Sequence, residues 1–185
     1  MLNTLRLIFV WFYCLPISDI ILLIAFATHL FLLIHRFQHK HVLWSCFVFI
    51  LLVAWITIIT YATVSGREAA GHDTLSLIPF HSYREVLNGG NPEILRSNFM
   101  NAVLFYPAGL MSASLLPDKW PRWVRMLLPL LLFAGLSSEI EYVQHFYGIG
   151  RAEIDDVIHN SMGALVGSIF AVFRLKIPQL NDEQK

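Results

Sequence analysis

The sequence predicts an all-α integral membrane protein, a polytopic helical bundle of about five transmembrane helices. Of its 185 residues, 56% are hydrophobic and only 14% are charged, whereas a soluble domain is about a quarter charged. Five apolar segments each approach the roughly 17–25 residues that cross a hydrocarbon core of about 30 Å. Most of the links between them are short, so we expect a single membrane domain over residues 1–185.

The five predicted spans follow one another along the chain. Residues 1–15 are apolar as well, but Pro16 interrupts them, so they either extend the first span with a kink or lie as an interfacial helix. The spans cover residues 17–34, 42–61, 98–116, 124–144 and 157–173.

Basic residues in the short links predict the orientation in the membrane, because cytoplasmic loops carry an excess of Lys and Arg. The links 35–41 and 117–125 and the C-terminal tail are basic, whereas the loop 62–97 is balanced and the link after residue 144 is acidic. We therefore expect the N-terminus outside and the C-terminus in the cytoplasm. Arg6 alone argues against this orientation.

The outer loop 62–97 contains its own helix signal. Asn91, Pro92 and Glu93 combine a capping residue, a first-turn proline and an acid that suits the helix dipole. A helix is predicted to begin near residue 92 and to run into the third span. Before it, residues 76–87 mix apolar and polar side chains, which is typical of a segment resting on the outer membrane surface.

Polar residues recur at helical spacing on the last three spans, and each column lies at the outer end of its span. Because the fourth and fifth spans are joined by a short loop, they are expected to be antiparallel neighbours. We therefore expect one carboxamide- and carboxylate-rich cluster just inside the outer leaflet. The columns are Asn98, Asn101, Phe105, Gly109 and Ser112; Ser137, Glu141 and Gln144; and Asp156, Asn160, Gly163 and Gly167.

These polar residues also have a purely structural interpretation. Interhelical hydrogen bonds contribute about 0.6 kcal/mol each in membranes, and such bonds alone would explain amides and acids inside the bundle. The small residues Gly109, Gly163 and Gly167 are interpreted as helix-packing positions, since they allow close approach of another helix. Pro107 either shapes a cavity or simply kinks the third span.

Several classes of site and partner are not expected. The formal net charge is zero, which gives no electrostatic field for a nucleic-acid partner. Cys14 and Cys46 lack any metal or redox spacing, and His145 and His159 do not form a known zinc motif. We therefore expect no disulfide, no metal and no cofactor.

Four motifs stand in order along the chain: LIPF at 77–80, NxxxFxPxG at 101–109, SxxIExxQ at 137–144 and GRxxxDDxxxNxxGxxxG at 150–167. Their sequence and spacing resemble the VanZ-like family of membrane proteins over about residues 75–170. Glu139 stands where this pattern has an apolar residue. The resemblance implies a bacterial cytoplasmic membrane protein with a role in low-level resistance to the lipoglycopeptide teicoplanin.

Three functions remain open. In the first, the outward cluster binds a cell-wall precursor, a lipid head group or a lipoglycopeptide, with Arg151 pairing either with a phosphate or carboxylate of the ligand or with Asp155 or Glu141. In the second, Glu141 and Asp156 act as acid and base of an intramembrane hydrolase or transferase. A small transporter is a third possibility, although the chain shows no internal repeat. The candidate binding residues are Asn98, Asn101, Gln144, Arg151, Asp155 and Asn160.

The expected partners follow from the same interpretation. They are membrane lipids, and a lipid-linked cell-wall precursor or a lipoglycopeptide as ligand. The sequence leaves the oligomeric state and the identity of the ligand open.

Overall fold

The computed structural model describes residues 27–28, 42–64 and 75–173. The described part of the chain is all-helical apart from two strands of two residues each. The predicted first span at 17–34, the segment 1–15 and the basic link 35–41 lie almost entirely outside the described residues. Within the described residues, two helices are long and apolar enough to cross a membrane, α3 and α6.

Four long helices correspond to the second to fifth predicted spans. They are α3 (Val42–Val64), α5 (Glu93–Leu115), α6 (Arg122–Tyr147) and α7 (Ile154–Val172). The predicted start near residue 92 is confirmed, because α5 begins at Glu93, and the amide of that residue donates to Asn91 Oδ1 at 3.0 Å. At the end of α6, Gly148 adopts φ 64°, a left-handed conformation that terminates the helix.

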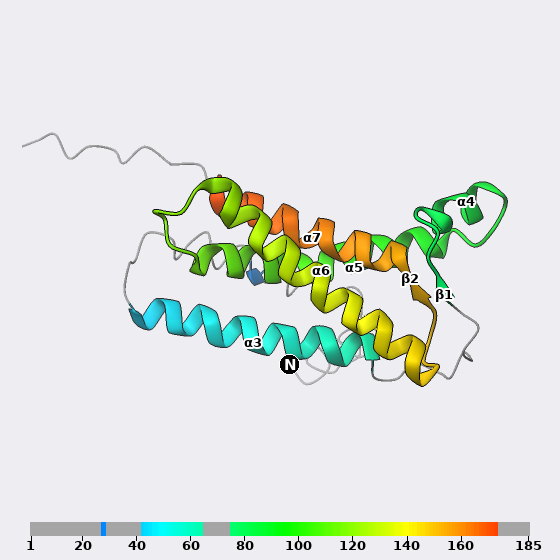
Figure 1. The fold of residues 1–185 in the computed structure, drawn as a ribbon, viewed down its shortest axis with the longest axis horizontal. Coiled ribbons are helices and arrows are strands. Elements are labelled where there is room, and N and C mark those ends of the chain that lie inside the picture. Colours follow the sequence, from blue (N-terminus) through cyan, green and yellow to red (C-terminus); the bar gives the residue numbers. More distant parts are fainter. Residues whose placement is uncertain (1–26, 29–41, 65–74, 174–185) are drawn as a thin grey trace, which may run out of the picture.

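Among the helices that the structure describes, α5 and α7 pack most closely; they run parallel, with α6 antiparallel to both (Figure 1). A Cβ atom added to Gly163 would lie 2.0 Å from the carbonyl oxygen of Ala102, and one added to Gly109 would lie 2.0 Å from that of Ala164. Gly167 makes the same kind of approach to α5. The backbones therefore touch at positions where a side chain would keep them apart.

The core of the bundle lies between α3, α5, α6 and α7. Phe105 of α5 and Phe133 of α6 meet edge to face, with ring centroids 6.1 Å apart. Trp55 of α3 donates its indole N–H to the carbonyl of Leu104 at 2.9 Å. That carbonyl lies one turn before Pro107, whose ring disturbs the backbone hydrogen bonds of the preceding turn. The helix nevertheless continues unbroken through Pro107, and α3 supplies a donor at this turn.

One end of the bundle carries two short strands that the sequence did not predict, together with a short helix inside the segment 76–87, which was predicted to rest on the outer membrane surface. Strand β1 (Leu75–Ser76) pairs in parallel with β2 (Ala152–Glu153), and the short helix α4 (His81–Leu87) follows β1. Figure 1 draws these elements together where α5 and α7 begin and α6 ends. We call this the polar end, because the buried carboxylates and carboxamides described next lie there.

Candidate functional site at the polar end

Asp155 forms the first of two polar networks, which ties α4 to α5 and α7. Its side chain is only 1% exposed. The carboxylate accepts hydrogen bonds from the backbone amides of Phe80 at 2.5 Å and Ser82 at 2.9 Å, and from the Ser82 hydroxyl. Asn98 of α5 in turn donates its Nδ2 to Ser82 Oγ at 2.9 Å. We call these four residues the Asp155 clamp.

The clamp determines the charge state of its carboxyl group. Burial raises the pKa of Asp155. The hydrogen bonds from Ser82 and Phe80 and the nearby His159 lower it by more than burial raises it, so that the pKa lies below its ordinary value. The clamp also holds Phe80 at φ 60°, a left-handed conformation that a residue with a bulky side chain rarely adopts. The clamp thus works with an ionised Asp155.

Tyr83 and His159 add a second tie between α4 and α7. The Tyr83 hydroxyl lies 2.7 Å from His159 Nε2, and the two rings stack with centroids 5.6 Å apart. His159 Nδ1 lies 2.5 Å from the carbonyl oxygen of Asp155. These contacts give His159 a structural partner on each ring nitrogen. Sequence reasoning missed Ser82 and Tyr83, since both contact residues more than seventy positions away.

The second network joins α6 to α7 and α3, and its members on α6 are the polar residues of the predicted column. Ser137 accepts from Asn160 Nδ2 of α7 at 2.8 Å, and Glu141 Oε2 accepts from the backbone amide of Glu153 at 2.9 Å. Gln144 Nε2 donates to the carbonyl of Thr63 at the end of α3, also at 2.9 Å. We call Ser137, Glu141, Gln144 and Asn160 the acceptor column.

Two oxygen atoms of the acceptor column have no hydrogen-bond partner within the described part of the chain. They are Gln144 Oε1 and Asn160 Oδ1, on side chains that are 1% and 3% exposed. A buried polar atom without a partner costs about 1–3 kcal/mol. Such atoms are therefore the natural positions for hydrogen-bond donors from a bound molecule.

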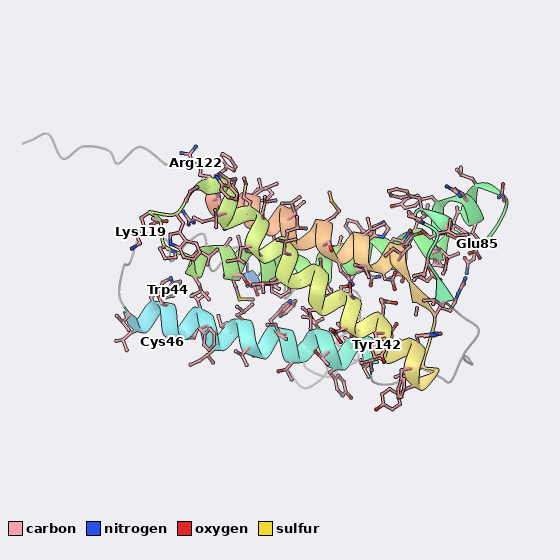
Figure 2. All side chains as sticks on the ribbon, in the orientation of Figure 1. Trp44, Cys46, Glu85, Lys119, Arg122 and Tyr142 are labelled. Atoms are coloured by element: carbon pink, nitrogen blue, oxygen red, sulfur yellow. The ribbon has the colours of Figure 1, made fainter. Side chains whose placement is uncertain are left out.

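Arg151 lies on the surface of the polar end, and its partners differ from the two acids weighed from sequence. Its side chain pairs with Glu153 at 3.0 Å and approaches Glu85 at 3.9 Å (Figure 2 labels Glu85). Asp155 and Glu141 were the two acidic partners expected from the sequence, but each of these carboxylates accepts a hydrogen bond from a backbone amide. Glu85 belongs to α4, whose contacts with the rest of the polar end the sequence did not predict.

The remaining predicted residues lie close to the two networks. Asn101 is half-buried on α5, one turn beyond Asn98. Asp156 is half-buried in the first turn of α7, next to Asp155. The expected single cluster is therefore divided, with Asp155 and Asn98 in the clamp and Asn160 and Gln144 in the acceptor column. Among the described residues, no group of three His, Cys, Asp or Glu side chains is arranged to hold a metal ion.

A family model described as VanZ/LLP1 matches residues 46–175, a range that includes nearly all of α3 and the whole of α4 to α7. No curated protein and no solved structure matches the chain.

Proposed function

Because the chain belongs to the VanZ/LLP1 family, we propose that it is an integral membrane protein of the bacterial cell envelope that binds an envelope molecule at its polar end. The ligand would be a lipid-linked cell-wall precursor, a lipid or a lipoglycopeptide such as teicoplanin. Binding would reduce the action of the drug on the cell. The observation that carries this proposal is the pair of buried carboxamide oxygens Gln144 Oε1 and Asn160 Oδ1, which have no hydrogen-bond partner among the residues that the structure describes.

Aromatic residues on α6 support a membrane position for the bundle. Trp123 and Tyr142 are each 61% exposed, and the rise of a helix between these positions is about 28 Å. That distance fits the hydrocarbon core of about 30 Å, and Trp and Tyr are enriched at its two boundaries. With these boundaries, Glu141 lies at the membrane–water interface, and Ser137 lies about 6 Å inside it.

The basic residues support the orientation of the polar end toward the outside. Lys119 and Arg122 lie at the opposite end of the bundle from Tyr142 (Figure 2). Under the positive-inside rule that opposite end would face the cytoplasm. We propose that α5 and α7, of 23 and 19 residues, cross the membrane with α3 and α6, and that residues 17–34 add a fifth span. The protein would then be a multi-pass protein of the cytoplasmic membrane.

A binding experiment tests this function. The purified protein is placed in lipid nanodiscs, and binding of teicoplanin and of a lipid-linked cell-wall precursor is measured for the wild type and for Glu141→Gln. Glu139→Gln removes the same charge two residues away, on an exposed part of α6, and is the matched control. We expect saturable binding of at least one ligand that weakens only in Glu141→Gln. Equal behaviour of all three proteins would refute the proposed site.

The alternative function is an intramembrane hydrolase or transferase with Glu141 and Asp156 as acid and base. It is favoured by the burial of the Glu141 carboxylate within the bundle, because general acid–base catalysis needs a carboxyl group held in place and shielded from water. Mass analysis of the precursor after incubation distinguishes the two functions. A product that is lost in both Glu141→Gln and Asp156→Asn would establish catalysis, whereas bound but unchanged precursor supports the binding function.

A further inference from the structure

We propose that the inner part of the acceptor column binds the hydroxyl group of a neutral lipid alcohol, held between Asn160 of α7 and Asn101 of α5. This inference rests on the proposed binding function and names the chemical class of the group that enters the membrane part of the site. It does not involve the Glu141 carboxylate, which lies one turn further toward the polar end and accepts the amide of Glu153.

Three polar side chains from three helices lie at one level of the bundle. Phe105 of α5 and Phe133 of α6 meet edge to face, and these two helices are antiparallel (Figure 1). Asn101 lies four residues before Phe105, and Ser137 lies four residues after Phe133. Each therefore lies on the same helix face as its aromatic neighbour, one turn nearer the polar end. Asn160 of α7 joins them, because its Nδ2 donates to Ser137 Oγ at 2.8 Å.

Asn160 Oδ1 requires a hydrogen-bond donor that the described part of the chain does not supply. The Asn160 side chain is almost fully buried, and Oδ1 has no partner among the described residues. A carboxamide oxygen can only accept a hydrogen bond, so a ligand that satisfies it must donate one. The carbonyl and ether oxygens of a lipid accept as well, and cannot fill this position. A hydroxyl group can.

Asn101 supplies the complementary contact and the access to the site. It is half-buried, whereas Ser137 and Asn160 are buried, and no hydrogen bond joins its side chain to another described residue. Its carboxamide nitrogen is a donor. One hydroxyl can therefore donate to Asn160 Oδ1 and accept from Asn101 Nδ2 through the same oxygen, entering from the side on which Asn101 is accessible.

The depth of the site favours a neutral group attached to an apolar chain. Ser137 lies about 6 Å inside the proposed membrane boundary, where a charged group costs more than at the interface. The described helices have no lysine or arginine at this level: none follows Arg96 on α5 or Arg125 on α6, and none occurs on α3 or α7. A phosphate would find no cation there, whereas a hydroxyl needs none and its apolar chain stays in the hydrocarbon.

The test compares lipids in which only the head group changes. Native mass spectrometry measures retention by the purified full chain of dioleoylglycerol, its methyl ether and dioleoyl phosphatidic acid, and a polyprenol with its methyl ether forms a second series. We expect the wild type to retain each alcohol about tenfold more tightly than its ether, because the ether has no donor for Asn160 Oδ1. Phosphatidic acid should be retained no better than the ether.

Two variants separate the roles of the two carboxamides. Asn160→Ala removes the acceptor and should bring the ratio of alcohol to ether retention to near one. Asn101→Ala removes the donor to the ligand oxygen, which the ether also has, so it should weaken both ligands by about fivefold and leave their ratio unchanged. Asn88→Ala removes the same group from an exposed residue after α4 and is the matched control, with no change expected.

The outcomes separate this inference from the proposed function. Equal retention of alcohol and ether by the wild type overturns the inference without any variant, even where Glu141-dependent binding of teicoplanin or precursor persists. A ratio that a folded Asn160→Ala leaves intact also overturns it, and if that variant does not fold, the wild-type ratio and Asn101→Ala decide.

Two further arms identify the source of the hydroxyl. A preference for the alcohol in only one of the two series supports the inference and identifies the lipid skeleton. Displacement of the lipid by millimolar glycerol would show that a soluble polyol suffices and would overturn the assignment to a lipid, whereas resistance to glycerol supports it. Tighter retention of phosphatidic acid than of dioleoylglycerol would show that the site selects a charged head group and would overturn the inference.

Discussion

The close approach of α5 and α7 predicts that adding one methyl group at Gly163 destabilises the bundle. In Gly163→Ala, the new Cβ would lie 2.0 Å from the Ala102 carbonyl oxygen, and real Cβ contacts essentially never fall below 3.0 Å. The helices must therefore separate by at least about 1 Å, which forfeits a quarter to a half of the dispersion energy of the atoms involved.

The magnitude follows from two opposing effects. Overpacking of this kind costs about 3 kcal/mol when backbone must move, while replacing glycine by alanine within a helix gains about 1 kcal/mol. The expected net loss in the free energy of unfolding is therefore about 2 kcal/mol. Gly135→Ala is the matched control, since nothing described lies within 4 Å of a Cβ there; it should gain up to about 1 kcal/mol.

The assay is reversible unfolding in mixed micelles, followed by tryptophan fluorescence as the fraction of sodium dodecyl sulfate rises. The wild type, Gly163→Ala and Gly135→Ala are compared under identical conditions. If Gly163→Ala unfolds at the same detergent fraction as Gly135→Ala, the two helices do not touch at this position, and the parallel α5–α7 contact described above is wrong.

Three further predictions address the clamp, the core and the orientation. Asp155→Asn should lower the free energy of unfolding by about 2–3 kcal/mol through loss of charge-assisted hydrogen bonds, measured by detergent unfolding at neutral pH. Because the pKa of Asp155 is lowered in the folded protein, its contribution is complete above about pH 4 and should disappear as the pH falls further; a variant difference that stays constant across this range would contradict the clamp. Trp55→Phe removes the indole donor to Leu104 and should lower the free energy of unfolding by about 1 kcal/mol in the same assay. An unchanged free energy of unfolding would show that this hydrogen bond does not form. Ile149→Cys, with the native cysteines replaced by serine, should react with a membrane-impermeant maleimide in intact cells; reaction only after permeabilisation would place the polar end in the cytoplasm.

Local sequence signals predicted the long helices well, since each depends on a few neighbouring residues. The start of α5 was predicted from Asn91, Pro92 and Glu93, and Asn91 does cap the amide of Glu93. The 3.6-residue period likewise predicted that Ser137 and Asn160 share an interface, and the two side chains are hydrogen-bonded. The membrane character of α5 and α7 stays a prediction.

Contacts between distant segments could not be predicted in the same way. Strands β1 and β2 have two residues each, which is too short for an alternating pattern to appear in the sequence. Without them, the position of α4 and its Ser82 could not be foreseen. Asp155 and Asp156 are adjacent acids on different faces of one helix, and only the location of α4 decides which of them becomes the buried anchor.

The two networks at the polar end are linked through the backbone of residues 152–155. Glu153 is paired with Ser76 in the β1–β2 ladder, and its amide donates to Glu141. Two residues later, Asp155 fixes α4 through Ser82. The β1–α4 segment therefore helps to hold the Glu141 carboxylate, although no side chain of α4 bonds to it among the described contacts. Binding at the acceptor column and the position of the β1–α4 segment should consequently depend on each other, because the backbone of residues 152–155 contributes to both networks.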